Sequence, residues 1–260
     1  MRATILQVNT IWGKPSENQS HAEALLREAP HSDLYILPEM WNTGFATAPF
    51  GIAEKLDECQ KSGSLAWMTK AAREHNAAIC GSLSLEIAEG KYANRCYFVH
   101  PDGSYSFYDK KHLFFGGGES ENYTPGNKRT IAEYKGIRFL LLVCYDLRFP
   151  VWARNDEDYD AIICVANWPQ PRQEAWETLL KARALENQCY VLGANRTGND
   201  SLTKYSGGSS IVSPYGKYLS LCGNMEEFST AELDIEALRH FRKVFPVLSD
   251  RDSAINKNTF

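Results

Sequence analysis

The sequence lacks the signals of several protein classes. Its 260 residues carry 28 basic and 32 acidic side chains, a formal net charge of −4, without the basic surplus or basic cluster of a nucleic-acid binder. No apolar run approaches the ~20 residues that span a bilayer. The opening MRATILQVNTIW has no long apolar segment and no cleavage site, so we expect no signal peptide. No CxxC pair or Cys/His cluster at zinc spacing is present. We therefore expect no nucleic-acid, membrane or metal partner.

Cysteine is present, but its pattern is not that of a disulfide framework. The chain has seven cysteines, an odd number, and they are widely spaced. Four lie in apolar, strand-like runs, where a buried reduced thiol is the usual state: Cys80, Cys96, Cys164 and Cys222. This usage predicts a reducing, cytoplasmic compartment.

The hydrophobic pattern is typical of an α/β protein. Hydrophobic residues make up 43% of the chain and charged residues 23%, which is ordinary for a globular protein. Strand-like runs are predicted at Ala3–Val8, Asp33–Leu37, Ala78–Leu85, Arg95–His100, Ile137–Cys144, Ala161–Ala166, Tyr190–Ala194, Ser209–Ser213 and Tyr218–Leu221. Several are apolar on successive residues, as in strands covered on both faces. Helical spacing predicts helices at Asn18–Ala29, Leu65–His75 and Gln173–Asn187. The alternation predicts helices packed outside sheets.

Turns and the C-terminal end complete this outline. Asp102-Gly103 indicates a hairpin, and Pro214-Tyr215-Gly216 indicates another. We expect a short helix at Ile235–Arg242 and, at residues 245–260, a tail or an arm against a partner subunit. No low-complexity tract, fixed-period repeat or linker-like stretch interrupts the chain, so we expect one domain over residues 1–260.

Polar residues follow apolar runs at three places, where a rigid scaffold usually holds reactive groups. In LYILPEM, Glu39 could be a general base with a pKa raised by apolar surroundings, or a solvated loop residue. In YDKKHLFF, a half-buried Lys110 or Lys111 could stabilise charge on a reacting oxygen, or both could belong to a basic turn. His112 is explained better as a structural histidine bonded to backbone than as a base. In LLVCYDLRFP, Cys144 could be a nucleophile beside backbone oxyanion donors, or one more buried cysteine.

Taken in this order, the three groups resemble the nitrilase superfamily of carbon–nitrogen hydrolases, whose triad is Glu, Lys and Cys in that chain order. The matching stretches are LPEMWNTGF, YDKKHLF and CYDLRFP, supported by ATILQVN, GSLSLE, NRCYFVHPDG, YTPG, VANWP and KARALENQCYVLGANRTG. The resemblance covers nearly the whole chain. It implies a four-layer α-β-β-α sandwich, with two sheets between layers of helices. It also implies subunit pairing through the helical layers, at least as a homodimer.

The resemblance implies a role for each matching residue. Cys144 would be the nucleophile, and Glu39 the general base that takes the thiol proton and later activates water. Lys110 would hold the oxyanion of the tetrahedral intermediate, with Lys111 as the alternative by one position. The backbone N–H of Tyr145 would be the second oxyanion donor.

The family often carries a second glutamate that positions the substrate. Glu119 and Glu121 both lie in the corresponding segment, GGGESENYTPG, and we favour Glu119. The chemistry implied is hydrolysis of a small-molecule amide to an acid and ammonia through a thioester. It requires neither a metal nor an organic cofactor.

Within the superfamily, EMWNTGF, YDKKHLF, CYDLRFPVWARN and VANWPQPR are most similar to the omega-amidase group. Those enzymes hydrolyse the terminal amide of 2-oxoglutaramate and 2-oxosuccinamate. Because such substrates are anionic, we expect a cation in the pocket, either Arg148 or Arg172. The alternatives are an ion pair of Arg148 with Asp146, and a surface position for Arg172 at a helix start. Five aromatic residues could line a small pocket, or could instead belong to the core or to a dimer interface: Trp41, Phe45, Phe114, Phe115 and Trp168.

Three other functions stay open at this point. One is an amidase or N-carbamoyl amidase for another small carboxylic acid. A catalytically silent binding protein on the same scaffold is the second, although the intact triad argues against it. A thiol-redox protein would need a CxxC motif or a nearby resolving cysteine, and neither is apparent.

Overall fold

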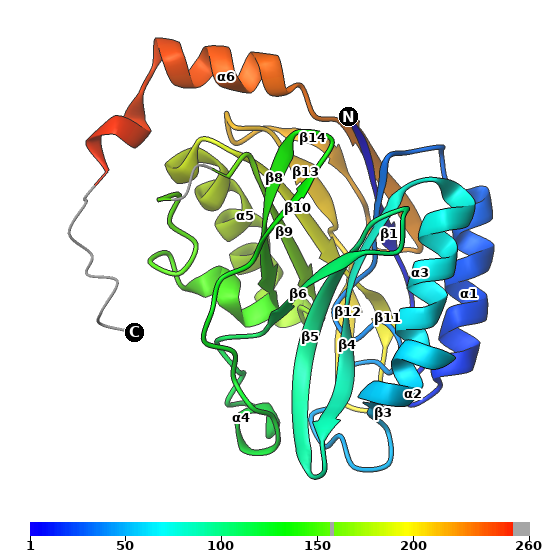
Figure 1. Cartoon of the computed structure of the whole chain (residues 1–260). Helices are drawn as coiled ribbons and strands as arrows, with labels where there is room; N and C mark the ends of the chain where they lie inside the picture. The colour runs from blue at the N-terminus through cyan, green and yellow to red at the C-terminus, as the bar shows by residue number, and fades with distance from the viewer. Residues whose placement is uncertain (157–158, 252–260) are drawn as a thin grey trace.

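Two β-sheets pack face to face at the centre of the structure, and helices cover their outer faces (Figure 1). The computed structural model describes residues 1–156 and 159–251. This is the four-layer α-β-β-α sandwich that the family resemblance implies.

The first sheet has seven strands, in the order β15-β1-β2-β4-β5-β6, with β3 paired to β4. The strands are β1 (Arg2–Gln7), β2 (Leu34–Ile36), β3 (Glu54–Lys55), β4 (Ala78–Ala88), β5 (Lys91–Val99), β6 (Tyr105–Asp109) and β15 (Glu227–Glu232). The helices on its outer face are α1 (Pro15–Glu28), α2 (Leu56–Lys61) and α3 (Ser64–His75). Their inward residues share one apolar cluster with the sheet.

The second sheet has six strands, in the order β14-β13-β10-β9-β8-β7. The strands are β7 (Ile131–Tyr134), β8 (Ile137–Val143), β9 (Ala161–Ala166), β10 (Tyr190–Asn195), β13 (Ser210–Val212) and β14 (Tyr218–Leu221). Its outer face is covered by α5 (Gln173–Asn187), whose Trp176, Leu180 and Ala184 are fully buried. A small hairpin joins β11 (Thr197–Asn199) to β12 (Lys204–Ser206).

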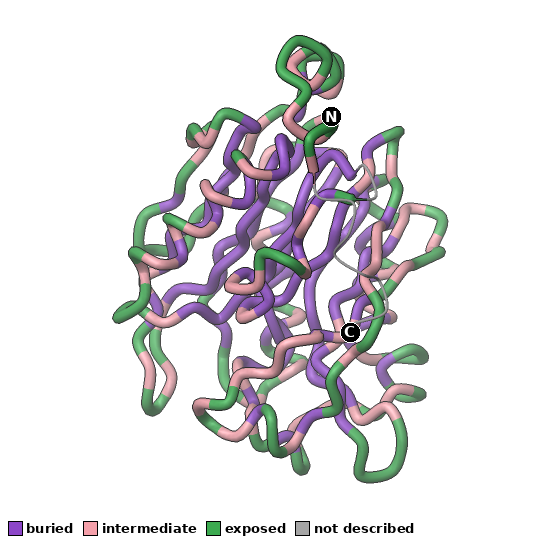
Figure 2. Tube along the Cα trace, turned by 90° about the vertical axis from the view of Figure 1, so that its left-hand side faces the viewer, coloured by how far each residue is buried: buried purple, intermediate pink, exposed green. Residues whose placement is uncertain are grey.

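The main core lies between the two sheets. Figure 2 shows the buried residues concentrated along the strands. Across the interface, the rings of Phe98 on β5 and Phe139 on β8 stack with centroids 5.6 Å apart. Burying apolar area of this kind stabilises the folded state by roughly 25 cal/mol per Å². The contact between the sheets therefore holds them together, and the strand ends of one sheet face those of the other.

Both sheets contain parallel central strands, and this topology places the site. β1, β2 and β4 run parallel in the first sheet, and β8, β9 and β10 in the second. Parallel strands end at the same edge of a sheet, where loops carry functional groups. Glu39 follows β2, Cys144 follows β8, and Asn167 follows β9. Three polar residues therefore lie at one edge of the sandwich, where apolar strands that are covered on both faces end.

The sequence predictions hold best for buried elements. Each predicted strand and helix overlaps an observed one, and Ala161–Ala166, Tyr218–Leu221 and Gln173–Asn187 match to the residue. Asp102-Gly103 joins β5 to β6, and Pro214-Tyr215-Gly216 joins β13 to β14. The longer strands without a prediction are β6, β7 and β15, and each is an edge strand with partly exposed residues on both faces. Short runs of mixed polarity carry little periodic signal.

The C-terminal end is described as far as Arg251. The predicted short helix is α6 (Ile235–Val244), which lies at the top of Figure 1. A turn of 3₁₀ helix follows at Val247–Asp250. Residues 252–260 of the predicted tail or dimer arm lie outside the described residues. Of the helices in the described part of the chain, none has the length and apolarity to cross a membrane.

Candidate active site

The side chains of Glu39, Lys110 and Glu119 meet in a fully buried cluster. Lys110 Nζ donates to Glu39 Oε1 at 2.8 Å and to the two carboxylate oxygens of Glu119 at 3.0 and 2.8 Å. All three side chains are fully buried. Lys111 instead lies over the ring of Trp152, 5.7 Å from its centroid, and Glu121 is exposed. The geometry thus selects Lys110 over Lys111 and Glu119 over Glu121 as the members of this cluster.

Cys144 lies at the edge of the same cluster and reaches the solvent. It is the first residue of a 3₁₀ turn, Cys144–Arg148, directly after β8, and 8% of its surface is exposed. Its φ of 47° is in the left-handed region, which costs a non-glycine residue energy and is often found at functional sites. Met40, directly after Glu39, has a φ of 43°. Glu39 and Cys144 therefore both lie at sharp turns that follow a buried strand.

Two asparagines hold the carboxylates in place. Asn94 on β5 donates through one Nδ2 to Glu39 at 2.7 Å and to Glu119 at 3.0 Å. The backbone N–H of Asn167 donates to the other oxygen of Glu39 at 2.8 Å, and its side chain donates to the Glu39 carbonyl at 2.8 Å. Each Glu39 oxygen therefore has a fixed partner, one from each sheet.

The end of β6 and the YTPG segment fix the backbone of Lys110. The N–H of Lys110 donates to the Asn94 carbonyl at 2.9 Å, and its carbonyl accepts from the N–H of Gly126 at 2.9 Å. A Cβ at Gly126 would lie 2.0 Å from the Asp109 carbonyl oxygen. Only glycine permits this close approach, so Gly126 allows the two segments to pack together.

The charges in the cluster are strongly perturbed. Burial alone would lower the pKa of Lys110, but the carboxylates of Glu119 and Glu39 outweigh it and hold that pKa well above its usual value. Burial raises the pKa of Glu119, and Lys110 offsets this only in part. Burial also raises the pKa of the Cys144 thiol well above its usual value, and the charge of Glu39 raises it further. Both shifts of the Cys144 pKa favour the neutral thiol, whereas the positive charge of Lys110 opposes them.

A third buried carboxylate, that of Asp146, connects the cysteine turn to the lysine loop. Its Oδ2 accepts from Tyr108 Oη at 2.8 Å and from the N–H of Val143 at 3.0 Å. Its Oδ1 accepts from the N–H of His112 at 2.9 Å and faces the ring Nδ1 at 2.8 Å. Because a carboxylate only accepts, Nδ1 carries the proton. The His112 ring also stacks on Phe149 at 3.7 Å. His112 is structural, as expected, but its ring partner is a carboxylate and not backbone.

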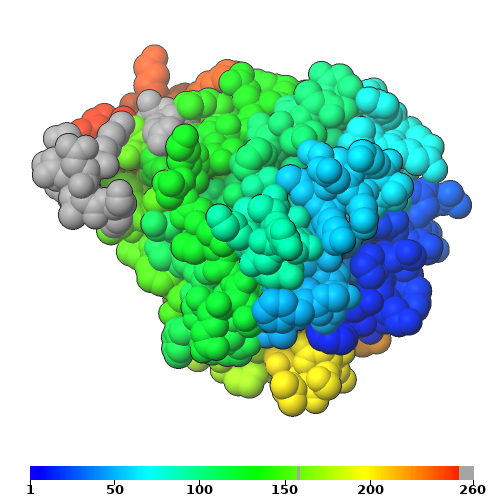
Figure 3. Space-filling model, turned by 60° about the horizontal axis from the view of Figure 1, so that its bottom comes forward, coloured from blue at the N-terminus to red at the C-terminus, as the bar shows by residue number. Residues whose placement is uncertain are grey.

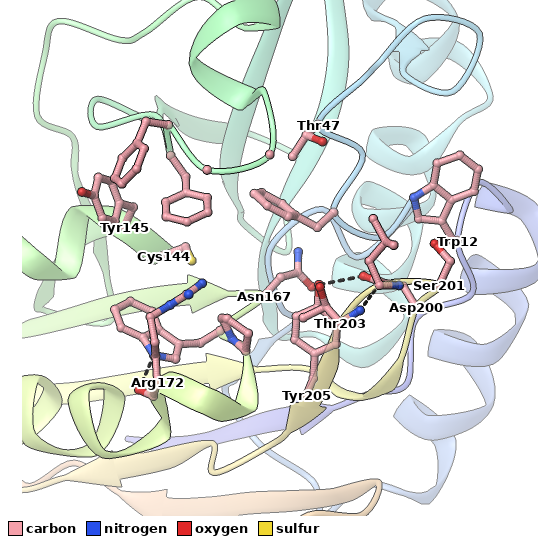
Figure 4. Close-up of a pocket in the computed structure, with 18 of the residues that line it drawn as sticks. Trp12, Thr47, Cys144, Tyr145, Asn167, Arg172, Asp200, Ser201, Thr203 and Tyr205 are labelled. Atoms are coloured by element: carbon pink, nitrogen blue, oxygen red, sulfur yellow. Dashed lines mark hydrogen bonds between the residues drawn. The ribbon is translucent and has the colours of Figure 1, made fainter.

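A cavity of about 580 Å³ opens at the thiol (Figure 4). Its lining includes Cys144 and the five residues predicted to contact the substrate, Phe114, Tyr145, Arg148, Trp168 and Arg172. Phe45 and Phe115 also line it. Trp41 does not, because it packs in the core under α3, with its ring 4.9 Å from that of Trp67. The prediction for Trp41 was therefore wrong for the pocket and right for the core.

The two arginines share a common arrangement in the cavity wall. The guanidinium of Arg148 lies over the Trp168 ring at 5.1 Å, and that of Arg172 over the Phe114 ring at 5.3 Å. The suggested ion pair of Arg148 with Asp146 does not form, because Tyr108, His112 and Val143 occupy that carboxylate. Both cations thus face a cavity that also contains the thiol.

Sequence reasoning missed Asn94, Asn167 and Asp146 as parts of the site. Asn167 follows an apolar strand as Glu39 and Cys144 do, and the same strand-end signal could have found it. Asn94 lies inside a strand and carries no such signal. In the part of the chain that the structure describes, no group of three His, Cys, Asp or Glu residues is arranged to hold a metal ion.

Known proteins resemble this chain over almost its whole length. The sequence model of the family described as carbon-nitrogen hydrolase matches residues 2–243. The omega-amidase YafV of Escherichia coli K12 is 41% identical over 254 residues, 97% of each chain. The 2-oxoglutaramate amidase of Bacillus subtilis is 35% identical, over 94% of this chain and 95% of its own.

Solved structures give the same picture. The protein XC1258 of Xanthomonas campestris, described as a CN-hydrolase superfamily protein with an arsenic adduct in its active site, superposes with a TM-score of 0.93. It is 38% identical and covers 98% of both chains. Nit3 of Saccharomyces cerevisiae, a nitrilase-superfamily member, superposes with a TM-score of 0.84 at 26% identity, over 100% of this chain and 97% of its own.

Proposed function

The chain belongs to the carbon-nitrogen hydrolase family, and from this premise we propose that it hydrolyses the terminal amide of a small keto acid, with Cys144 as the nucleophile. The observation that carries the proposal is the buried cluster of Glu39, Lys110 and Glu119 beside a thiol that opens into a cavity. An amide is a poor electrophile, so its attack needs an activated nucleophile and a stabilised oxyanion.

In the first half of the reaction, Glu39 takes the thiol proton while the sulfur of Cys144 bonds to the amide carbon. The oxyanion that forms is held by the Lys110 ammonium and the backbone N–H of Tyr145. Each such donor contributes about 3–4 kcal/mol to the transition state. The C–N bond then breaks, and Glu39 returns the proton to the leaving nitrogen. The products are ammonia and a thioester on Cys144.

In the second half, the same groups hydrolyse the thioester. Water enters the position that ammonia left, and Glu39 takes its proton. The same two donors hold the second oxyanion, and the C–S bond breaks to give the acid and a neutral thiol. Glu119 keeps Lys110 charged and oriented throughout, because it holds the ammonium with two carboxylate oxygens.

The two arginines in the cavity wall support the proposal that the substrate is an anion. Arg148 and Arg172 face the same space as the thiol, and guanidinium groups bind carboxylates well. The terminal amides of 2-oxoglutarate and 2-oxosuccinate carry a carboxylate at the end away from the amide. The names of two relatives, omega-amidase and 2-oxoglutaramate amidase, point to the same substrate class.

The direct test is ammonia release from 2-oxoglutaramate, measured beside glutamine, butyramide, an N-carbamoyl amino acid and a nitrile. We expect rapid turnover of the keto-acid amide, and none with Cys144→Ala. Turnover confined to another compound of the panel would contradict the proposed substrate and keep the mechanism. Turnover retained by Cys144→Ala would contradict the mechanism.

The arginines are tested by a second comparison. Replacing the arginine that binds the carboxylate by methionine should raise KM for 2-oxoglutaramate at least tenfold more than KM for butyramide, which carries no charge. We compare Arg148→Met with Arg172→Met. Equal effects of both variants on both amides would contradict a role in reading the carboxylate.

We also propose a homodimer in a reducing, cytoplasmic compartment. Exposed apolar side chains gather on and near α5 and α6, which supports pairing through this helical layer: Leu185, Tyr215, Leu219, Val244 and Phe245. The seven cysteines are all free, as they would be in a reducing compartment. Sedimentation of the wild type and of Val244→Glu would test the interface. We expect the variant to dissociate, and identical sedimentation would contradict it.

A further inference from the structure

The cavity is larger than the proposed substrate requires. Its volume of about 580 Å³ lies within the range of pockets that enclose drug-sized ligands, whereas a five-carbon keto-acid amide has only about ten non-hydrogen atoms. In Figure 4, Cys144 and Arg172 lie toward one end of the cavity and Trp12 lies at the other, with Asn167 between them. The part near Trp12 is therefore left open when a small acyl group occupies the thiol end.

We call this open part the outer subsite and define it by Trp12, Ala48, Leu202, Thr203 and Tyr205. These residues come from three segments that are distant in the sequence. Trp12 lies in the loop before α1, Ala48 in the loop that follows the Glu39 turn, and the others in the β11–β12 hairpin. Trp12 is 52% exposed and Leu202 is 95% exposed. Large apolar side chains this exposed, in the same cavity as the Cys144 thiol, are suited to contact a ligand.

The outer subsite is already formed in the structure. Asp200 Oδ1 accepts from the N–H groups of Leu202 and Thr203 at 2.9 and 2.8 Å, and Oδ2 accepts from Tyr205 Oη at 2.8 Å. These bonds fix the hairpin turn that carries Leu202. The hairpin is the yellow protrusion at the lower edge of Figure 3, beside segments from the N-terminal third of the chain. A ligand that binds here therefore does not have to order the backbone of this turn.

Trp12 is also held by packing. Gly44 has a φ of +73°, and a Cβ there would lie 3.4 Å from Trp12 Cδ1. The indole therefore rests on the backbone of the turn that carries Phe45. Of the charged groups nearby, Asp200 also lines the cavity, and its two carboxylate oxygens accept three hydrogen bonds from the hairpin. The buried Arg196 guanidinium lies 4.5 Å from the centroid of the Tyr205 ring. Trp12, Ala48 and Leu202 form the apolar part of this surface.

We propose that the outer subsite binds an aromatic substituent on the nitrogen of the amide, so that the enzyme cleaves N-aryl amides as well as unsubstituted ones. This inference rests on the proposed function, in which the arginines hold the carboxylate of the acyl part at the thiol end. The substituent on the leaving nitrogen is then the part of the substrate that extends toward Trp12. An aromatic ring suits the indole of Trp12 and the side chain of Leu202.

The reaction follows the same course with a different leaving group. The sulfur of Cys144 bonds to the amide carbon, Glu39 takes the thiol proton, and the C–N bond breaks as that proton passes to nitrogen. For an anilide the amine released is aniline, which is neutral at pH 7. Water then hydrolyses the thioester to the acid and restores the thiol.

The test compares two amides of the same acid in matched variants. The ratio of kcat/KM for the 5-anilide to that for the unsubstituted 5-amide of 2-oxoglutarate is measured in the wild type, Trp12→Ala and Leu202→Ala. Phe50→Ala is the control, because Phe50 is an exposed aromatic residue that stacks on Tyr92 and lies outside the cavity. We expect each subsite variant to lower the ratio about tenfold, as for other lost contacts in an apolar pocket. The control should keep the ratio within about twofold.

The outcomes separate this inference from the proposed function. A wild type that cleaves the amide and not the anilide, or a Trp12→Ala ratio equal to that of Phe50→Ala, would overturn the outer subsite alone. If both keto-acid amides are inert, the anilide-to-amide ratio of kcat/KM is measured with butyranilide and butyramide, which carry no carboxylate. A tenfold fall of that ratio in Trp12→Ala would support the subsite, although the proposed substrate would then be wrong. If no amide is cleaved, protection of Cys144 from iodoacetamide by aniline decides. Protection in the wild type and not in Trp12→Ala supports the subsite, and equal protection or none overturns it.

Discussion

Replacing Lys110 by methionine isolates what the buried ammonium contributes to the site. The side chain donates three hydrogen bonds of 2.8–3.0 Å to two fully buried carboxylates. Methionine has a similar length and no charge, so Glu39 and Glu119 would face each other without a cation between them. Removing one partner of a buried ion pair costs about 3–5 kcal/mol of stability. We expect a loss of this size at pH 8, where both carboxyl groups would otherwise be ionised.

The loss should shrink as the pH falls. Two like charges in one buried site raise the pKa of one carboxyl group above its value of about 4.3 in the unfolded chain. The folded variant then binds a proton that the unfolded chain does not bind in the window between the two pKa values. Its stability therefore falls as the pH rises through that window, by about 1.4 kcal/mol per pH unit. The Lys110→Met variant should be less destabilised at pH 5.5 than at pH 8.

Urea unfolding followed by tryptophan fluorescence at pH 5.5 and 8 measures both effects. Lys111→Met is the matched control, because it makes the same change one residue away, at a half-buried side chain over Trp152. We expect the control to change stability by less than about 0.5 kcal/mol. Its turnover should stay near that of the wild type, whereas Lys110→Met should lose about 10²–10³-fold in kcat. The reasoning is refuted if the two variants unfold alike, or if the loss in Lys110→Met is the same at both pH values.

Three further predictions follow from the site. Because burial raises the pKa of Cys144, alkylation of the resting enzyme by iodoacetamide should still accelerate above pH 9, and a plateau below pH 8 would contradict this. Glu119→Ala should lower kcat at least 10²-fold and Glu121→Ala should leave it unchanged in the ammonia assay; the reverse result would move the second glutamate to the exposed position. Asp146→Ala should cost about 3 kcal/mol in urea unfolding, since it leaves the buried donors of Tyr108 and its neighbours unpaired, each at about 1–3 kcal/mol, and an unfolding midpoint like that of the wild type would contradict it.

The sequence predicts the fold best where burial is complete. Strands such as Ala161–Ala166 are apolar on every residue because both faces are covered, and their ends are visible as the first polar residue. Glu39 and Cys144 were found by this signal, and they do lie at the edge where the parallel strands end. Edge strands such as Tyr105–Asp109 were missed because they alternate irregularly and are held mainly by backbone pairing with a neighbour. Pairing of this kind leaves no mark on the composition.

The interior of the site was predictable only in part, because its contacts are remote in the sequence. Glu39 and Asn167 are 128 residues apart, and Glu39 and Asn94 are 55 apart. No local spacing predicts these bonds. The choice between Lys110 and Lys111 depends likewise on which side chain turns inward at the end of β6, and a strand reverses its side-chain direction at every residue. The family resemblance favoured Lys110 and Glu119 and left Lys111 and Glu121 as alternatives, and the fold shows which side chains enter the buried cluster.

The proposed mechanism keeps the charge of the buried cluster constant, and this explains why a neutral thiol can serve as the nucleophile. In the resting state two carboxylates face one ammonium, a net charge of one negative unit. A free thiolate at Cys144 would add a second negative charge at a largely buried position beside Glu39, and for this reason the pKa of the thiol is raised. When the proton moves to Glu39 as the sulfur attacks, one carboxylate becomes neutral while the oxyanion appears beside Lys110. The net charge does not change, and it does not change again when Glu39 gives the proton to the leaving nitrogen. The reaction therefore moves a negative charge within the cluster and does not add one. For this reason a buried site that disfavours a thiolate can still favour attack by the neutral thiol.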